Sequence, residues 1–307
     1  MIALRPVASD ADLEMWARIK STVVPNEPVT PQQLVDADEP DRLLLLASLD
    51  GIDAGCGVGA PSSFGGRAYC AASVLTAHRR RGVGTALFRA LADHGRAIGR
   101  EGVNAFVDAG DDGSIAFARS FGLEEADHQL EQLRRVSPGE QAPLPPPGVE
   151  LVSLSGRREE LLREAWESVA LEGYDDLPMP GPVTHSLETW LREEATRPDG
   201  SFVAIEDGVV VGYAGLLVHA NGPASAEHGL TAVRRDRRRR GIARALKQAQ
   251  LHWASRSGVL ELVTWTQRGN EAMQALNRGL GYRDVSKLLT MHGPLPALDG
   301  RPAPPLR

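Results

Sequence analysis

A repeated segment is the feature of this sequence that most constrains its fold. Residues 74–87 read VLTAHRRRGVGTAL, and residues 233–246 read VRRDRRRRGIARAL, which is an offset of 159 residues. The same offset relates Gly122 to Gly281 further along the chain. A register that is kept over this distance indicates two copies of one structural unit in tandem.

Each copy predicts a turn that binds an anion. An apolar strand leads through an arginine-rich turn into a helix that begins with small residues. The N–H groups at a helix N-terminus are unpaired, glycine allows a phosphate oxygen to approach them, and guanidinium groups add charge. The residues predicted to bind the anion are Val74, Arg79, Arg80, Arg81, Gly82, Val83 and Gly84 in the first copy, and Val233, Arg238, Arg239, Arg240, Gly241, Ile242, Ala243 and Arg244 in the second.

The pattern R-x-x-G-x-G/A, placed after an apolar strand, resembles the coenzyme A pyrophosphate loop of the GNAT superfamily of acyl-CoA N-acyltransferases. A later helix that ends around a glycine, at Ser114–Leu123 and Asn270–Tyr282, fits the same superfamily. The resemblance implies an α/β (α+β) fold with two tandem GNAT domains, each a mixed, mostly antiparallel sheet flanked by helices. It also implies acetyl-CoA as the acyl donor and no metal.

The domain organisation follows from the two copies and the sequence between them. We predict an N-terminal GNAT domain over residues 1–136, a proline-rich linker over 137–148, a C-terminal GNAT domain over 149–292 and a flexible tail over 293–307. In each domain we expect the order β-α-α-β-β-β-α-β-α-β, with the last strand completing its own sheet. By the resemblance, the fourth and fifth strands diverge, and the pantetheine arm lies between them like an added strand.

Composition excludes several classes of protein. The net charge is −6, so the arginine runs are local features of an acidic chain, which argues against nucleic-acid binding. We find neither a long apolar window nor a signal-peptide pattern, and we expect a cytoplasmic protein without a membrane partner. Cys56 and Cys70 lack metal-ligand spacing and are expected to be reduced core thiols.

The general base is predicted from the histone-acetyltransferase branch of the superfamily, in which a glutamate lies six residues before the position of Val233. Here that residue is Glu227, and the same step in the first copy reaches Ala68. The alternative for Glu227 is a solvated carboxylate at the strand edge. Strand alternation places its neighbour His228 on the other face of the sheet.

The last helix departs from the superfamily pattern. Many GNAT enzymes carry a tyrosine four residues before its glycine, where Ala118 and Asn277 stand here. Asn277 is a candidate donor to the leaving sulfur, with a structural amide as the alternative. Asn270 matches an asparagine that contacts the cofactor in the superfamily, and the first copy has Asp111 at that position.

Acceptor specificity in this fold usually comes from the segment between the first two helices. In the second half we expect this to be a loop over Leu171–Pro182, where Tyr174, Asp175 and Asp176 would attract a cationic amine. Solvated loop charge is the alternative.

Two functions remain open from the sequence. The first is an N-acetyltransferase that acts on a small-molecule primary amine by direct transfer in the C-terminal domain, with a structural or regulatory N-terminal domain. The second is a non-catalytic protein that binds or senses acyl-CoA. Actinobacterial mycothiol synthase also has two GNAT halves, but its last-helix tyrosine pattern is absent here, so we expect another acceptor. The acceptor's identity, the acyl chain and the oligomeric state stay open.

Overall fold

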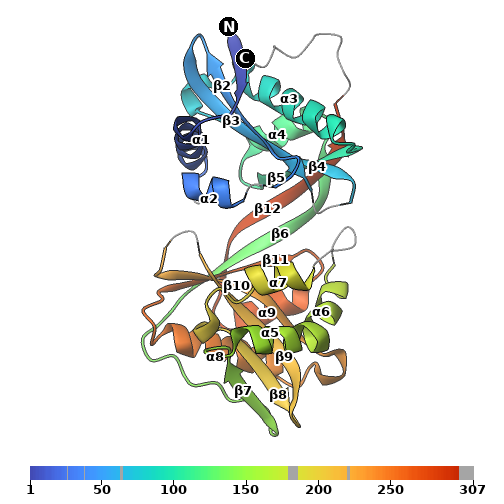
Figure 1. Ribbon diagram of the computed structural model, residues 1–307. Coiled ribbons are helices and arrows are strands. Elements are labelled where there is room, and N and C mark those ends of the chain that lie inside the picture. The colour runs from blue at the N-terminus through green and yellow to red at the C-terminus, as the bar shows by residue number, and fades with distance from the viewer. Residues whose placement is uncertain (26, 38, 63–64, 179–185, 220–221, 297–307) are drawn as a thin grey trace. The chain divides into compact units, whose positions relative to one another are not determined.

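The computed structural model describes residues 1–25, 27–37, 39–62, 65–178, 186–219 and 222–296 (Figure 1). The chain divides into two compact units. Unit 1 is Met1–Asp127 together with the C-terminal segment from Leu288, and unit 2 is His128–Lys287. Each unit is a mostly antiparallel sheet with one parallel strand pair and helices on its faces, which confirms the predicted fold class.

The sheet of unit 1 has the order β1-β2-β3-β4-β5-β12. Its strands and helices are β1 (Ile2–Pro6), α1 (Asp10–Val23), α2 (Pro31–Asp36), β2 (Leu43–Leu49), β3 (Ile52–Pro61), β4 (Arg67–Val74), the 3-10 turn η1 (Thr76–His78), α3 (Val83–Ala97), β5 (Gly102–Asp108), α4 (Asp112–Ser120) and the end of β12 (Arg283–Pro294).

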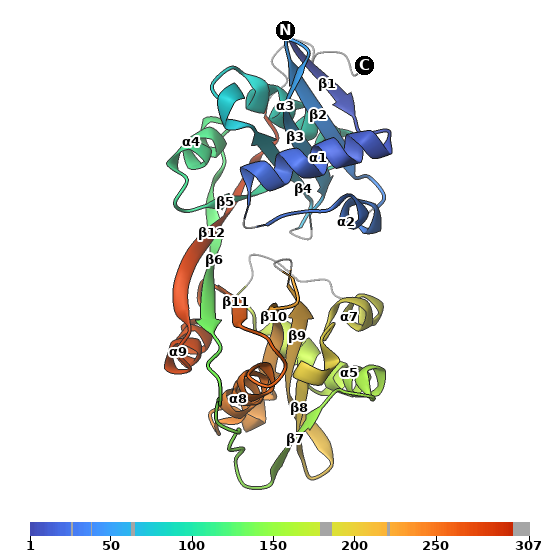
Figure 2. The same ribbon diagram turned by 90° about the vertical axis from the view of Figure 1, so that its left-hand side faces the viewer.

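Helices cover both faces of this sheet, which explains why β2 is apolar at successive positions. Leu45 and Ala47 pack in the core formed with α3, whereas Leu46 packs on the opposite face with Trp16 of α1. Alternating side chains of a strand point to opposite faces, so a strand between two helical layers must be apolar on both. Figure 2 shows α1 and α2 in front of β2–β4 and α3 behind them.

The sheet of unit 2 has the order β6-β11-β10-β9-β8-β7. Its elements are most of β6 (Glu124–Arg135), β7 (Val149–Ser153), α5 (Arg158–Ala165), the π-helical turn η2 (Trp166–Ala170), α6 (Leu171–Asp175), α7 (Leu187–Glu193), η3 (Pro198–Gly200), β8 (Phe202–Glu206), β9 (Val209–Val218), β10 (Ser225–Val233), η4 (Arg235–Arg237), α8 (Ile242–Ala254), β11 (Glu261–Gln267) and α9 (Glu271–Gly279).

One face of this sheet packs against the helices from α5 to α7 and the other against α8. Val210 and Tyr213 belong to the core with α5 and α7, and Val211 belongs to the core with Ile242 and Leu246 of α8. The two faces therefore carry different chemistry, and each can be assigned from the core to which its residues belong.

The last strand of each repeat pairs within the other unit, contrary to expectation. Residues 288–294 of β12 pair antiparallel with β5, and residues 129–135 of β6 pair antiparallel with β11. Both strands have twelve residues, which span about 40 Å at 3.4 Å per residue and so extend from one unit into the other. The compact units consequently differ from the sequence repeats of residues 1–136 and 149–292.

Fragments cut at the two kinds of boundary should behave differently. Residues 149–292 lack β6 and leave the edge of β11 unpaired, whereas residues 128–287 contain every strand of the unit 2 sheet. We expect a cooperative thermal transition by circular dichroism for 128–287, and none for 149–292, because the second fragment loses a ladder of seven residue pairs. The opposite result would contradict the strand exchange.

Candidate active site

The two arginine-rich turns adopt one backbone conformation. In unit 1, Arg80 and Gly82 have φ values of 61° and 88°, and in unit 2 the matching Arg239 and Gly241 have values of 59° and 89°. In both turns a short 3-10 segment precedes these residues and a long helix follows directly. The repeat seen in the sequence is thus a repeat of local structure.

An arginine side chain closes each turn onto the strand before it. The Nε of Arg79 donates to the carbonyl of Val74 at 3.0 Å, and the Nε of Arg238 donates to the carbonyl of Val233 at 2.8 Å. The first arginine of the R-x-x-G pattern is therefore a structural clamp through Nε, which leaves its terminal nitrogens for other partners.

The turn in unit 2 presents backbone donors at the start of α8. The first helical bond runs from the N–H of Ala245 to the carbonyl of Gly241, so the helix does not use the N–H groups of residues 242–244. Gly241 is required by its left-handed φ, and an added Cβ would meet no atom within 4 Å. The backbone is therefore open at the Cβ position of Gly241, directly before these N–H groups.

The arginines around this turn are largely neutralised, contrary to the expectation from their number. Asp176 binds Arg235 at 2.6 Å and Arg238 at 2.5 Å, and Glu206 binds Arg237 and Arg240, each at 2.6 Å. Hydrogen bonds from Arg235 lower the pKa of Asp176 to about 2. Hydrogen bonds from Arg240 and Arg237 do the same for Glu206.

Arg239 is the exception among the cations of this turn. Within the described residues it forms no ion pair. Its counterpart in unit 1, Arg80, also lacks an ion pair in that part of the chain. In the described part of both turns, the arginine at the left-handed position thus has no carboxylate partner.

The segment predicted as an acceptor loop is mostly helical. Residues 171–175 form α6, which continues α5 through the π-helical turn η2, and residues 179–182 lie outside the described residues. Tyr174 packs against Trp166 and Trp190, with ring centroids 6.4 and 6.1 Å apart. Asp175 is exposed, and Asp176 is occupied by arginines. The expectation that Asp176 attracts the amine is therefore corrected, because its carboxylate already has two guanidinium partners.

The fourth and fifth strands of both units diverge after three residue pairs. In unit 2, β10 pairs with β11 only from Ser225 to Glu227, and in unit 1, β4 pairs with β5 only from Arg67 to Tyr69. Beyond these positions the parallel ladder ends, and the strand edge can pair with an added extended segment. The divergence that the GNAT resemblance implies is present in both copies.

A β-bulge in β10 decides which face Glu227 occupies. His228 pairs with Leu216 of β9, but Thr231 pairs with Ala214, so β10 holds one residue more than β9 in this interval. Even spacing would put Glu227 on the face of Val233, which packs with α8. The extra residue instead turns Glu227 to the face of α5–α7.

Glu227 lies among other carboxylates on that face. It is half-buried, and its pKa is raised to about 6, first by burial and then by the negative charges of Glu131 on β6 and of Glu194 after α7. Glu131 accepts a hydrogen bond from Ser286 at 2.5 Å. A carboxylate that titrates near pH 6 is suited to accept a proton at neutral pH.

The opposite face holds a buried polar cluster. The Nε2 of His228 lies 2.6 Å from the hydroxyl of Tyr282, and the Nζ of Lys247 lies 5.4 Å from the centre of the Tyr282 ring. Lys247 is 1% exposed, and among the described residues its ammonium has no hydrogen-bond partner. Burial lowers its pKa to about 7 and lowers the pKa of His228 well below its ordinary value. As strand alternation predicts, His228 faces away from Glu227.

The asparagines of the last helix serve the fold. Asn270 caps α9 by accepting the N–H of Met273, as Asp111 caps α4 by accepting the N–H of Ser114. Asn277 is fully buried and donates to Gln132 of β6 at 2.9 Å. The geometry therefore favours a structural amide at Asn277 over a donor to sulfur.

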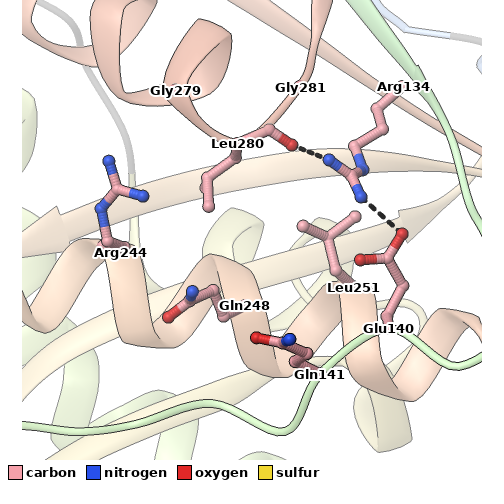
Figure 3. A pocket seen from close by; sticks show the side chains of 9 residues that line it. All are labelled: Arg134, Glu140, Gln141, Arg244, Gln248, Leu251, Gly279, Leu280 and Gly281. Atoms are coloured by element: carbon pink, nitrogen blue, oxygen red, sulfur yellow. Dashed lines mark hydrogen bonds and ion pairs between the residues drawn. The ribbon is translucent and has the colours of Figure 1, made fainter.

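A cavity of about 320 Å³ lies between α8 and the end of α9 (Figure 3). Arg134 of β6 crosses its rim, where it donates to the carbonyl of Leu280 and to Glu140 of the linker. Arg244 and Gln248 line the side formed by α8. The cavity thus offers a cationic wall one helical turn from the N-terminus of α8.

Within the described residues we find no group of His, Cys, Asp or Glu that could hold a metal ion. In the same part of the chain, no helix has the length and apolar character needed to cross a membrane.

Comparison with known proteins identifies the family. The acetyltransferase (GNAT) family matches residues 12–123 and 160–282. The chain belongs to this family. The match confirms the tandem GNAT arrangement predicted from the repeat, and by family the protein is an N-acetyltransferase.

The curated relatives carry one name. The chain is 30% identical to a mycothiol acetyltransferase of Nocardia farcinica over 83% of its own length and 84% of the relative's. It is also 30% identical to a mycothiol acetyltransferase of Brachybacterium faecium over 71% of its length, and it spans 66% of that relative. Among solved structures, a tandem GNAT protein from the clavulanic acid biosynthesis pathway shares the fold, with a TM-score of 0.76, 20% identity, and coverage of 97% of this chain and all of that one.

The buried Lys247 predicts a pH-dependent stability. Between the folded pKa of about 7 and the ordinary value of 10.5, the unfolded chain binds a proton that the folded chain does not, so stability should rise with pH in this window. Lys247→Met removes the buried ammonium. We expect it to raise the free energy of unfolding by about 1–3 kcal/mol at pH 6.5, with a smaller gain at pH 9.5. Denaturant unfolding at both pH values measures this, and a loss of stability at both would contradict it.

Proposed function

We propose that this protein is an acetyl-CoA-dependent N-acetyltransferase that acts on a small-molecule primary amine by direct transfer in unit 2. The observation that carries the proposal is the position of Glu227. A half-buried carboxylate that titrates near pH 6 stands where β10 and β11 diverge, on the strand that leads into the arginine-rich turn.

The residues of unit 2 fit a coenzyme A thioester. The free N–H groups at the start of α8 and the uncompensated Arg239 suit a pyrophosphate, and Arg244 extends the cationic surface to the cavity beside α9. The open edge of β10 suits an amide-bearing arm. A pyrophosphate would compete with Asp176 for Arg238, so binding has to displace part of an existing ion pair.

The thioester supplies an activated acetyl group, and the residues of this chain supply the rest. Glu227, deprotonated above pH 6, accepts a proton from the ammonium form of the acceptor, directly or through a water. The carboxylates of Glu131 and Glu194 favour a cation on this face. Backbone N–H groups at the end of β10, beside Val233, would polarise the thioester carbonyl.

The acceptor is proposed to be a primary amine of the kind used by the mycothiol acetyltransferases. The sequence argued against that acceptor, because position 277 holds an asparagine and not a tyrosine. The mycothiol acetyltransferases nevertheless match this chain over most of its length. A panel with that acceptor, polyamines, amino acids and aminoglycosides, read out by thiol release and mass spectrometry, would identify the substrate.

We propose a structural or regulatory role without turnover for unit 1. Its β4 pairs with β3 in unbroken register from Ala68 to Val74, so no bulge reverses the alternation. Ala68 is fully buried in the core with α3. A carboxylate at this position would face the core and not an acceptor. The first copy therefore lacks both the glutamate and the β-bulge that would turn it toward the acceptor.

The coenzyme site can be tested by closing each turn. In Gly241→Trp, a large side chain and an unfavourable φ occupy the space before α8, and acetyl-CoA should no longer stabilise the protein. For the wild type the stabilisation is about 2.7 kcal/mol at a hundredfold excess over Kd. Gly82→Trp is the matched control in unit 1, and most of the acetyl transfer should survive in it. The reverse pattern, measured by thermal shift and thiol release, would assign catalysis to unit 1.

The general base can be tested by Glu227→Gln. The variant keeps the shape of the side chain and removes its basicity, so kcat should fall by roughly 10²–10⁴ while acetyl-CoA affinity is kept. In the wild type, activity should rise with pH through about 6 as Glu227 loses its proton. The defect should shrink at high pH, where the amine deprotonates unaided. Full activity of Glu227→Gln at neutral pH would place the base elsewhere.

A further inference from the structure

The carboxylate of Glu194 lies on the bulge of β10. Its Oε1 accepts the backbone N–H of Leu230 at 3.3 Å, and its Oε2 accepts the hydroxyl of Tyr213 at 3.0 Å. Leu230 belongs to the bulged interval, in which one N–H is left without a partner from the strand ladder. Glu194 supplies that partner.

Two glycines make room for this carboxylate. A Cβ built on Gly215 of β9 or on Gly229 of β10 would overlap the Oε2 of Glu194. Neither glycine has a positive φ, so the backbone conformation does not demand glycine at these positions. Both glycines instead leave space above the sheet for the Glu194 carboxylate.

The segment that carries Glu194 is itself fixed. Arg158 of α5 donates to the carbonyl groups of Leu191, Glu194 and Ala195 at 2.7, 2.5 and 3.1 Å, which satisfies the free carbonyls at the end of α7. Ala195 has a φ of 49°, an uncommon value for a residue with a side chain. A strained backbone held by three hydrogen bonds indicates that the direction of Glu194 is determined by its surroundings.

We propose that Glu194 is a positioning residue for the transfer reaction: it holds the bulge that turns Glu227 toward the acceptor. This rests on the proposed function, in which Glu227 is the base. Without the bulge, strand alternation would return Glu227 to the face of α8.

The charges that face Glu227 come from two elements. Glu131 on β6 and Glu194 after α7 both raise its pKa, and Leu217 and Val263, the residues paired with it on β9 and β11, are uncharged. Removing a negative neighbour stabilises the carboxylate form of Glu227. The pKa of Glu227 should therefore fall when Glu194 is neutralised, and activity should persist to lower pH.

The experiment compares pH profiles of kcat for acetyl transfer by the full chain, together with a ¹³C NMR titration of the Glu227 carboxyl. In Glu194→Gln the amide oxygen can still accept the N–H of Leu230, so the bulge should be kept while the charge is removed. The acid limb and the NMR midpoint should both move down by about half a pH unit or more. Glu193→Gln is the matched control, since this adjacent glutamate is exposed and paired with Arg192, and it should leave both curves unchanged.

A second variant displaces the Glu194 carboxylate sterically and leaves its charge unchanged. Gly229→Ala puts a methyl group where this carboxylate lies, and moving the charge away from Glu227 should shift the acid limb to lower pH, as in Glu194→Gln. If Glu194→Gln does not fold, Gly229→Ala replaces it in the comparison with wild type.

Each outcome separates this inference from the proposed function. An acid limb and an NMR midpoint that stay at the wild-type position in a folded Glu194→Gln or Gly229→Ala overturn the role of Glu194. An inactive wild type, or a fully active Glu227→Gln, overturns the proposed function, and the NMR titration still tests whether Glu194 acts on Glu227.

Discussion

The chemistry of unit 2 depends on a single extra residue in β10. Opposite Gly215 of β9, the strand carries both Gly229 and Leu230, and this reverses the alternation of side chains between Glu227 and Val233. One end of the strand can therefore pack against α8 next to the arginine-rich turn while the other presents a carboxylate to the opposite face. In unit 1, β4 is regular, and the same position is a buried alanine. Two copies of one fold thus differ at this position through backbone register as well as through residue identity.

Charge is arranged differently on the two sides of the unit 2 site. Around the turn, four carboxylates (Glu172, Asp176, Glu206 and Asp236) hold arginines in place, so its geometry is fixed before any ligand arrives. Around Glu227, burial and the carboxylates of Glu131 and Glu194 raise its pKa. Preorganised donors for a phosphate and a group of carboxylates that attracts an ammonium are complementary needs of one transfer reaction.

Much of the fold could be predicted from the sequence because its signals are local. Asp-Gly is a strong hairpin signal, and Asp50-Gly51 and Asp207-Gly208 lie at the turns between β2 and β3 and between β8 and β9. The glycines of the arginine-rich turns lie at the left-handed starts of α3 and α8. The bulge depends on the pairing register of β9 and β10, and the position of Glu194 depends on how the segment after α7 packs on these strands; no local pattern reports either. Gly229 inside a strand was the one available signal for the bulge. The helical state of residues 171–175 was missed because Gly173 resembles a loop residue, although it is there to let α6 approach Ala232 of β10 closely.

The exchange of last strands makes each compact unit depend on both repeats. β6 is encoded at the end of the first repeat, yet from residue 129 it is paired with β11 of unit 2. It brings Glu131 to the surroundings of Glu227, Gln132 to the buried amide of Asn277, and Arg134 to the cavity beside α9. The unit that is proposed to carry the base is therefore built partly from the repeat that lacks one. A change in β6 can therefore alter the surroundings of Glu227 although it lies in the first repeat.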